Sequence, residues 1–174
     1  MRRFILFLLF FPASLAIMRQ IFVSVDLSFS ILALGTFAMC LEQARMAAVD
    51  LQQIDHFQEK INDFRLDNFF MVTISTIVLE LVGFYLAAFC LGWGALIVLI
   101  SQIWFHCLAK IQLQPTTDKI IDYGIMPRLP VLFADGIGIM FVVLWLEKIA
   151  PLIMATTLTA MLLIYGGIKY GQQQ

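Results

Sequence analysis

Charged side chains are scarce in this sequence, and hydrophobic ones are abundant. Asp, Glu, Lys and Arg make up 13% of the 174 residues, against about 25% in a typical soluble domain. Hydrophobic residues make up 61%, and a water-soluble fold of this length cannot bury that much apolar surface. The net charge of −1 provides no field to attract nucleic acid. The composition therefore argues against a nucleic-acid-binding protein and predicts the lipid bilayer as a partner.

Common catalytic and nucleotide-binding motifs are also missing. The sequence contains no GxxxxGK[ST], GxGxxG, HExxH or GxSxG pattern. Its three cysteines, Cys40, Cys90 and Cys107, are odd in number and lie in apolar runs, so they predict neither a disulfide framework nor a zinc site. We therefore expect no enzymatic activity and no cofactor, although an intramembrane site can be assembled from separated helices.

Long hydrophobic runs are plentiful and divide the chain into candidate membrane spans. A transmembrane helix needs about 20 mostly apolar residues, and six runs approach this length. No internal repeat or low-complexity linker interrupts them. We therefore predict a single all-α domain over residues 1–174, a polytopic membrane protein with about six transmembrane helices. The predicted spans are residues 4–23, 27–41, 69–91, 94–111, 130–146 and 151–168.

The basic residues favour one orientation of these spans. With six crossings and the amino terminus inside, all basic residues except Arg19 and Lys148 fall on the cytoplasmic side, which is nine of the eleven. The positive-inside rule predicts such a bias. The first run follows Arg2-Arg3 and resembles a secretory signal, but we interpret it as an uncleaved first span because the chain starts at Met1. We expect a multi-pass protein of the cell inner membrane with both termini cytoplasmic.

Turn-forming residues mark three of the predicted connections. Asp26 and its neighbouring serines can accept amide protons at the start of the second helix. The sequence Leu91-Gly92-Trp93-Gly94 predicts a tight turn between the third and fourth helices, since glycine permits a sharp reversal. The polar stretch 114–129 predicts a cytoplasmic loop, with a short interfacial helix over Asp118–Tyr123.

Residues 42–67 form the one substantial polar segment, and they contain neither proline nor glycine. We predict that the second transmembrane helix continues through them as a cytoplasmic helical stalk. One face of this stalk carries an apolar seam at helical spacing, and the opposite face is acidic, which favours a protein partner over anionic lipid. The seam either binds that partner or folds back on its own chain. The residues predicted to bind the partner are Leu51, Ile54, Phe57, Ile61 and Phe64.

Three residues of the same stalk could form a metal site, and a plain solvated surface is the alternative interpretation. His56, Glu59 and Asp63 fall on one helical face, and their side chains are of metal-binding types. Solvated acidic faces are far more common on exposed helices than metal sites. We therefore predict no metal there.

Four of the polar residues within the apolar runs are candidates for a functional site, since a polar group in such a run needs a partner. Glu80 is in the middle of the third run, and Gln102 and His106 share one face of the fourth. Positions equidistant from the predicted turn place Glu80 opposite Phe105, so we predict a contact with Gln102 or His106. Asp135 lies among glycines early in the fifth run and completes a predicted intramembrane polar cluster. We favour a structural clamp, with a proton relay, an ion site or a metal or pigment ligand at His106 as alternatives.

The hairpin region also carries a resemblance. The stretch Gly92-Trp93-Gly94-Ala95-Leu96-Ile97-Val98-Leu99-Ile100-Ser101-Gln102-Ile103-Trp104-Phe105-His106, followed by Ile111-Gln112-Leu113, resembles a family of small uncharacterised polytopic membrane proteins of cyanobacteria. It covers about a fifth of the chain. The resemblance implies a thylakoid or plasma membrane location and association with photosynthetic complexes. It implies no catalytic residues.

Together these features favour an accessory protein over a catalyst. The main hypothesis is a non-enzymatic accessory, assembly or scaffold subunit that docks on a larger membrane complex, because catalytic motifs are absent and the stalk offers a surface for a partner. The main alternative is a small ion- or proton-coupled transporter or channel subunit that uses Glu80, His106 and Asp135. A third hypothesis is an intramembrane enzyme or a pigment-binding protein, and a bound lipid is also compatible with the composition.

Overall fold

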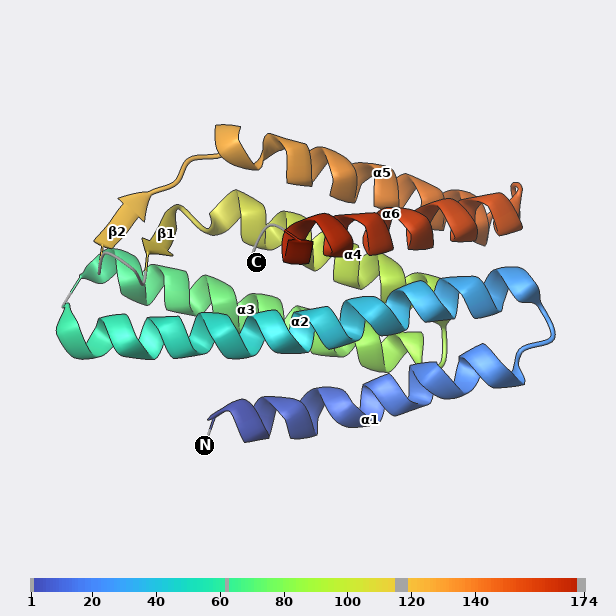
Figure 1. The fold of residues 1–174 in the computed structure, drawn as a ribbon, viewed down its shortest axis with the longest axis horizontal. Coiled ribbons are helices and arrows are strands. Elements are labelled where there is room, and N and C mark those ends of the chain that lie inside the picture. Colours follow the sequence, from blue (N-terminus) through green and yellow to red (C-terminus); the bar gives the residue numbers. More distant parts are fainter. Residues whose placement is uncertain (1, 62, 115–118, 172–174) are drawn as a thin grey trace.

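Long helices dominate the structure, a computed structural model that describes residues 2–61, 63–114 and 119–171 (Figure 1). The all-α prediction is therefore confirmed, with the addition of one small two-stranded sheet in the described part of the chain. The elements, in chain order, are α1 (Arg2–Val23), α2 (Leu27–Lys60), α3 (Phe64–Ala87), α4 (Leu91–Leu108), β1 (Ile111–Gln114), β2 (Lys119–Asp122), the 3-10 helix η1 (Met126–Arg128), α5 (Leu129–Leu146) and α6 (Pro151–Gly171).

Five helices in the described residues, α1 to α5, are long and apolar enough to cross a membrane. The last helix, α6, contains a shorter apolar segment, Pro151–Gly167. Membrane association is thus supported by the length and composition of the helices, and a sixth crossing stays a prediction.

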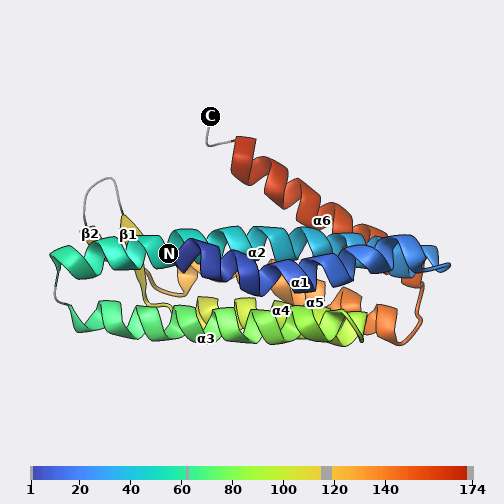
Figure 2. The same ribbon diagram turned by 90° about the horizontal axis from the view of Figure 1, so that it is seen from below.

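The helices run alternately up and down along one long axis (Figure 1). The α1–α2, α3–α4 and α5–α6 connections lie at one end, while the α2–α3 connection and the β1–β2 hairpin lie at the other. Neighbours in the sequence pack on each other, and α6 packs on α2. Towards its carboxyl end, α6 leans away from the other helices (Figure 2).

The start of α2 follows from local capping chemistry. Asp26 is the residue before the helix, and its Oδ1 accepts a hydrogen bond from the Ser28 backbone N–H at 2.8 Å. This contact satisfies one of the amide groups that a helix leaves open at its first turn. The predicted reversal near Asp26 is confirmed.

The α3–α4 reversal occupies Ala88–Cys90, before the glycines that were predicted to form it. Gly92 and Gly94 instead lie in the first turn of α4, where they allow close packing. A Cβ atom on Gly94 would collide with the Ala87 backbone, and one on Gly92 would lie 2.6 Å from Leu146 Cδ2. The predicted turn position was wrong because these glycines provide space between helices rather than backbone freedom.

The loop after α4 contains a hairpin where an interfacial helix was predicted. β1 and β2 pair antiparallel, with Ile111 opposite Asp122 and Gln114 opposite Lys119. The predicted helix over Asp118–Tyr123 is wrong for its described part, and Asp118 itself lies outside the described residues. Adjacent β-branched isoleucines favour an extended strand, and β1 buries Ile111 and Leu113. Pairing between the strands satisfies the backbone groups of both.

The predicted stalk is partly confirmed. α2 continues without a break to Lys60, but the chain then reverses, and α3 begins at Phe64. One helix over residues 42–67 is therefore wrong at its end, because Asp63 caps α3 by accepting a hydrogen bond from the Arg65 backbone N–H at 2.9 Å. The stalk is the far end of a helical hairpin.

Candidate functional site

The first candidate site is a buried polar pair between α3 and α4. Glu80 is 3% exposed, and its Oε1 accepts a hydrogen bond from Gln102 Nε2 at 2.5 Å. The predicted contact between Glu80 and Gln102 or His106 is therefore confirmed for Gln102. The nearby Thr73 and Thr76 hydroxyls donate to backbone carbonyls of their own helix. Their donors are thus used within α3.

Close packing surrounds this pair and explains its geometry. A Cβ atom on Gly83 would lie 2.7 Å from Val98 Cγ2, so α3 and α4 approach each other where the side chain of residue 83 is missing. Small residues at such an interface allow interhelical hydrogen bonds to form at short range. The Glu80–Gln102 contact joins two helices and has the form of a structural clamp.

His106 follows Gln102 by one helical turn and lies in the last turn of α4. Its Nδ1 is buried and has no hydrogen-bond partner, and its ring packs edge-on against Phe105 at a centroid distance of 5.7 Å. It lines a cavity of about 440 Å³ together with Lys110 and Tyr123 from the loop region. His106 therefore belongs to the hairpin end of the bundle.

Asp135 is half-buried on α5, and its Oδ2 has no hydrogen-bond partner. On the same face, Gly138 packs near Leu99 of α4. In the described part of the chain, no hydrogen bond or ion pair joins Asp135 to Glu80, Gln102 or His106. The predicted four-residue cluster is thus joined by hydrogen bonding only at Glu80 and Gln102.

A metal site is not formed by the side chains placed in the structure. Within residues 2–61, 63–114 and 119–171, no group of three or more His, Cys, Asp or Glu side chains is arranged to hold an ion. Of the three stalk residues considered for metal, His56 and Glu59 lie on α2 and Asp63 follows the reversal. The three residues therefore do not share one face of a single helix, because α2 ends at Lys60, before Asp63.

The apolar seam of the stalk is largely covered by its own chain. Leu51 is 6% exposed, and Ile54 and Phe57 are 0% exposed. These three residues cannot meet a partner in this conformation, so their predicted role in partner binding is corrected to a packing role. Ile61 is half-buried, and Phe64 alone is widely open, at 76%. Of the two alternatives, binding a partner or folding back on its own chain, the structure shows the second for most of the seam.

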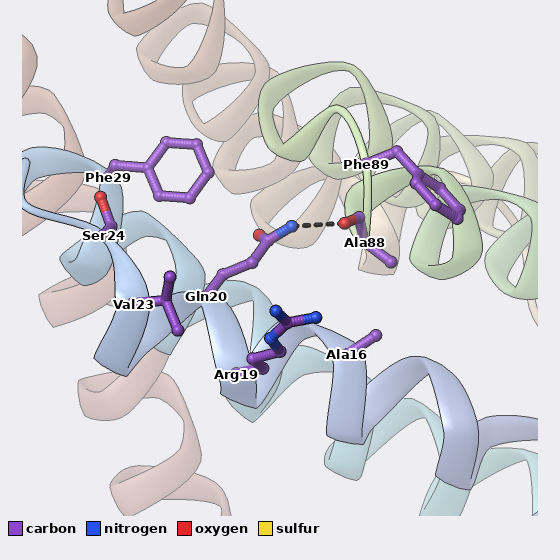
Figure 3. Close-up of a pocket in the computed structure, with 8 residues that line it drawn as sticks. All are labelled: Ala16, Arg19, Gln20, Val23, Ser24, Phe29, Ala88 and Phe89. Carbon is purple, nitrogen blue, oxygen red and sulfur yellow. Dashed lines mark hydrogen bonds between the residues drawn. The ribbon is translucent and has the colours of Figure 1, made fainter.

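Gln20 was not singled out from the sequence, yet it joins distant parts of the chain (Figure 3). Its Nε2 donates to Ala88 O at 2.6 Å and to Ala87 O at 3.1 Å. These carbonyls end α3, where backbone acceptors lack helical partners. The only hint in the sequence was an amide side chain near the end of an apolar run. Its partners lie 67 and 68 residues away.

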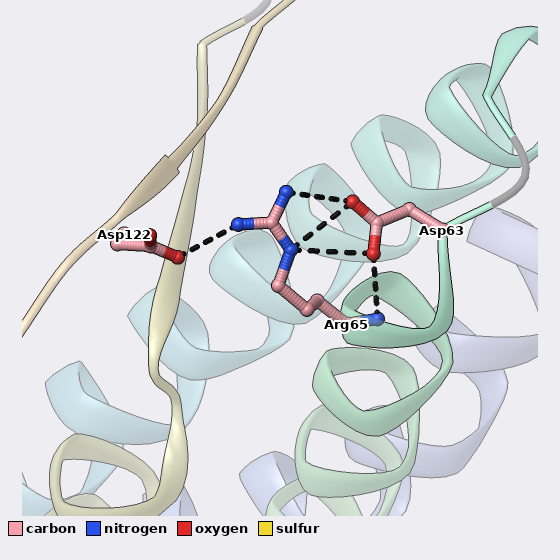
Figure 4. A network of polar contacts seen from close by, with 3 residues as sticks. All are labelled: Asp63, Arg65 and Asp122. Atoms are coloured by element: carbon pink, nitrogen blue, oxygen red, sulfur yellow. Dashed lines mark hydrogen bonds and ion pairs between the residues drawn. The ribbon is translucent and has the colours of Figure 1, made fainter.

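Arg65 links the start of α3 to the hairpin (Figure 4). Its guanidinium bonds Asp63 Oδ2 at 2.8 Å and Asp122 Oδ1 at 2.8 Å. The hydrogen bond from the Arg65 side chain holds the pKa of the Asp63 carboxyl below its ordinary value of 3.8. Arg65 thereby links the start of α3 to β2 through a solvent-exposed contact.

Arg128 is buried, at 6% exposure, although the sequence placed it on the charged cytoplasmic side. It donates to the His106 and Ile111 carbonyls, each at 3.3 Å. Its guanidinium also stacks over Tyr123, 5.0 Å from the ring centroid. The apolar and proline residues on either side of Arg128 were the available signal for burial. Arg128 ties α5 to the end of α4.

No family model matches the chain, and no curated protein or solved structure is similar to it at a significant level. The resemblance of residues 92–106 to cyanobacterial membrane proteins therefore stays a prediction.

Proposed function

We propose that the chain is a non-enzymatic accessory, assembly or scaffold subunit that docks on a larger membrane complex. The proposal includes a multi-pass arrangement in the cell inner membrane or thylakoid membrane, with both termini cytoplasmic. A photosynthetic complex is the candidate partner that the cyanobacterial resemblance implies.

The first support is the unequal length of the helices. α4 has 18 residues, which corresponds to about 27 Å and matches a hydrocarbon core of about 30 Å. α2 has 34 residues, or about 51 Å, so it extends beyond a membrane of that thickness. We define the cap as residues 51–61, 63–66, 109–114 and 119–128, which gather at the hairpin end (Figure 1).

The cap is held in shape by contacts between distant residues. Arg65 bridges Asp63 and Asp122, and Arg128 bonds the carbonyls of His106 and Ile111. A surface that is already ordered loses less conformational entropy when a partner binds. These contacts support the cap as a docking element.

Phe64 is the observation that carries the proposal. It is 76% exposed, and it sits directly beside the Arg65 bridge at the start of α3. Aromatic side chains on an ordered surface are common anchors in protein interfaces. Phe64 is also the exposed member of the residue set that the sequence assigned to partner binding.

The test is copurification in a mild detergent, comparing Phe64→Ser with Phe22→Ser. Phe22 is 78% exposed and lies at the other end of the bundle, so it is a matched control. We expect the wild-type chain to migrate with a larger complex. Phe64→Ser should lower the recovery of that complex about tenfold, as for an interface anchor, and Phe22→Ser should leave it unchanged.

Two outcomes would contradict the docking proposal. A wild-type chain that is recovered only as an isolated monomer would remove the partner altogether. Equal recovery of the complex with Phe64→Ser and with wild type would show that the cap is the wrong surface. If the expected result is obtained, mass spectrometry of the copurified proteins identifies the partner.

A small ion- or proton-coupled transporter or channel subunit is the alternative function. It is favoured by Asp135, whose Oδ2 lacks a partner within a predicted span. Reconstituted vesicles with an imposed ion or proton gradient would test it. Uptake that Asp135→Asn abolishes would favour the transporter, whereas the absence of any uptake would leave the docking proposal in place.

A further inference from the structure

A second cavity lies at the opposite end of the bundle from the cap, between α1, the start of α2 and the α3–α4 turn (Figure 3). Its volume is about 450 Å³, which falls within the range of about 300–1,000 Å³ seen for small-molecule sites. Its walls combine apolar and polar groups. The lining residues include Arg19, Gln20, Val23, Phe29 and Phe89.

Arg19 provides the charge in this cavity. It lies near the end of an apolar helix and is exposed, and no ion pair or hydrogen bond joins its side chain to the residues that the structure describes. None of the residues that line the cavity is acidic. A guanidinium with five donors in a cavity that no carboxylate lines is suited to an anion with several oxygens, such as a phosphate ester.

Gln20 supplies a fixed acceptor beside this cation. Its Nε2 is held by the Ala87 and Ala88 carbonyls, and its Oε1 is buried without a hydrogen-bond partner. In Figure 3 the Arg19 guanidinium points to the same side of α1 as the Gln20 amide. A buried acceptor without a partner is unfavourable, so a hydroxyl or amine on the ligand would satisfy it.

The remaining walls are apolar and open towards the surface. Phe89 is 85% exposed and Val23 is 66% exposed, and Phe29 covers part of the inner side (Figure 3). The cavity lies where two apolar helices, α1 and α3, end and the chain turns. If α1 and α3 span a bilayer, their ends and the cavity between them lie at the depth of the lipid headgroups.

We propose that this cavity binds a phosphate ester, supplied by the headgroup of an anionic phospholipid. Arg19 pairs with the phosphate, Gln20 Oε1 accepts from a headgroup hydroxyl, and the apolar walls contact the glycerol and the first acyl carbons. This site is separate from the cap, so the proposal does not depend on docking. It assigns a specific lipid site to the side of the bundle that carries few basic residues.

The test measures binding of phosphatidylglycerol to the purified full chain in detergent by native mass spectrometry, with phosphatidylcholine as the reference lipid. The variants are Arg19→Gln, Arg19→Lys and, as a control, Lys148→Gln. Lys148 is a cation in the α5–α6 connection, and it does not line the cavity. We expect Arg19→Gln to weaken phosphatidylglycerol binding about tenfold, as for loss of a hydrogen bond to a charged group. Lys148→Gln should leave binding unchanged, and Arg19→Lys should retain most of it.

A soluble competitor separates the two sources of the phosphate. Glycerol 3-phosphate at millimolar concentration should not displace the lipid, because it lacks the acyl chains that contact the apolar walls. Displacement by glycerol 3-phosphate would overturn the lipid assignment in favour of a soluble phosphate ester. Equal binding of both lipids, or equal loss with Arg19→Gln and Lys148→Gln, would overturn the site altogether.

Discussion

The α3–α4 pair and the α5 helix differ in how tightly they pack, although both are rich in apolar residues and glycines and each has an acid within its apolar stretch, Glu80 and Asp135. Of the residues in the candidate spans of α3 and α4, 39% and 44% are buried, against 11% for α5. Glu80 on α3 has a hydrogen-bond partner, whereas Asp135 Oδ2 on α5 has none. Close packing at Gly83 and Gly94 therefore gives Glu80 a partner on the neighbouring helix, whereas the looser packing of α5 leaves Asp135 Oδ2 without one.

The largest contrast should come from the same substitution placed in the two regions. Gly94→Ala introduces a Cβ atom that collides with the Ala87 backbone, whereas a Cβ atom on Gly136 meets nothing within 4 Å. We expect Gly94→Ala to lower the free energy of unfolding by about 3 kcal/mol, as for severe overpacking. Gly136→Ala should raise it by about 0.5 to 1 kcal/mol, because alanine favours a helix interior and meets no clash there. Unfolding in mixed micelles with increasing denaturing detergent gives both values.

Equal stability of these two alanine variants would contradict the difference in packing between α3–α4 and α5. A stable Gly94→Ala protein would mean that α3 and α4 separate easily. The α3–α4 packing would then not distinguish Glu80 from Asp135.

A smaller contrast is expected from the polar side chains themselves. Gln102→Leu removes the donor to Glu80 and leaves a buried carboxyl oxygen without its partner, so it should lower the unfolding free energy by about 1 to 2 kcal/mol. Asp135→Asn removes no hydrogen bond at Oδ2 and should change it by less than about 0.5 kcal/mol. The same detergent titration measures both variants.

The Asp135 result also distinguishes the two functions considered above. A marked loss of stability in Asp135→Asn would indicate a hidden structural role for that carboxylate. Wild-type stability together with lost ion uptake would favour the transporter instead. Unchanged stability and unchanged ion uptake would exclude Asp135 from both roles.

Local chemistry explains why much of the fold could be predicted. The lengths of the hydrophobic runs predicted the helices, and the Asp26 side chain predicted the start of α2. The Glu80 partner was found because antiparallel helices pair positions at similar distances from the turn. The actual reversal at Ala88–Cys90 comes before the predicted one, which places the contact at Gln102, nearer to the turn than Phe105.

Contacts between distant residues explain what the sequence could not reveal. The seam periodicity of Ile54 and Phe57 identified a packing face, but a period does not identify the surface that covers it. Arg65 and Asp122 are 57 residues apart, and neither lies in a recognisable motif. Their pairing depends on the hairpin, which forms only when Ile111–Gln114 and Lys119–Asp122 meet. Such contacts follow from the assembled fold.

The Asp63–Arg65–Asp122 contacts of the cap should show the smallest effect, because they are exposed to solvent, unlike the Glu80–Gln102 contact. Hydrogen bonds from Arg65 lower the pKa of Asp63 in the folded protein, so the ionised carboxylate stabilises the fold above the ordinary value of 3.8. This stabilisation is lost as the pH falls below 3.8 and through the lowered pKa of the folded state. We therefore expect the protection of the amides at the start of α3, measured as the exchange rate relative to the intrinsic rate at the same pH, to fall on acidification in the wild type.

Asp63→Asn isolates this effect, since asparagine can still cap α3 but carries no charge to pair with Arg65. The variant should exchange faster than wild type at neutral pH and should lose the Asp63 contribution to the pH dependence below 3.8. Asp67→Asn, in the same first turn of α3, is the control and should keep the wild-type response. If Asp63→Asn also kept it, the acid sensitivity would arise elsewhere, and Arg65 would hold the hairpin through Asp122 alone.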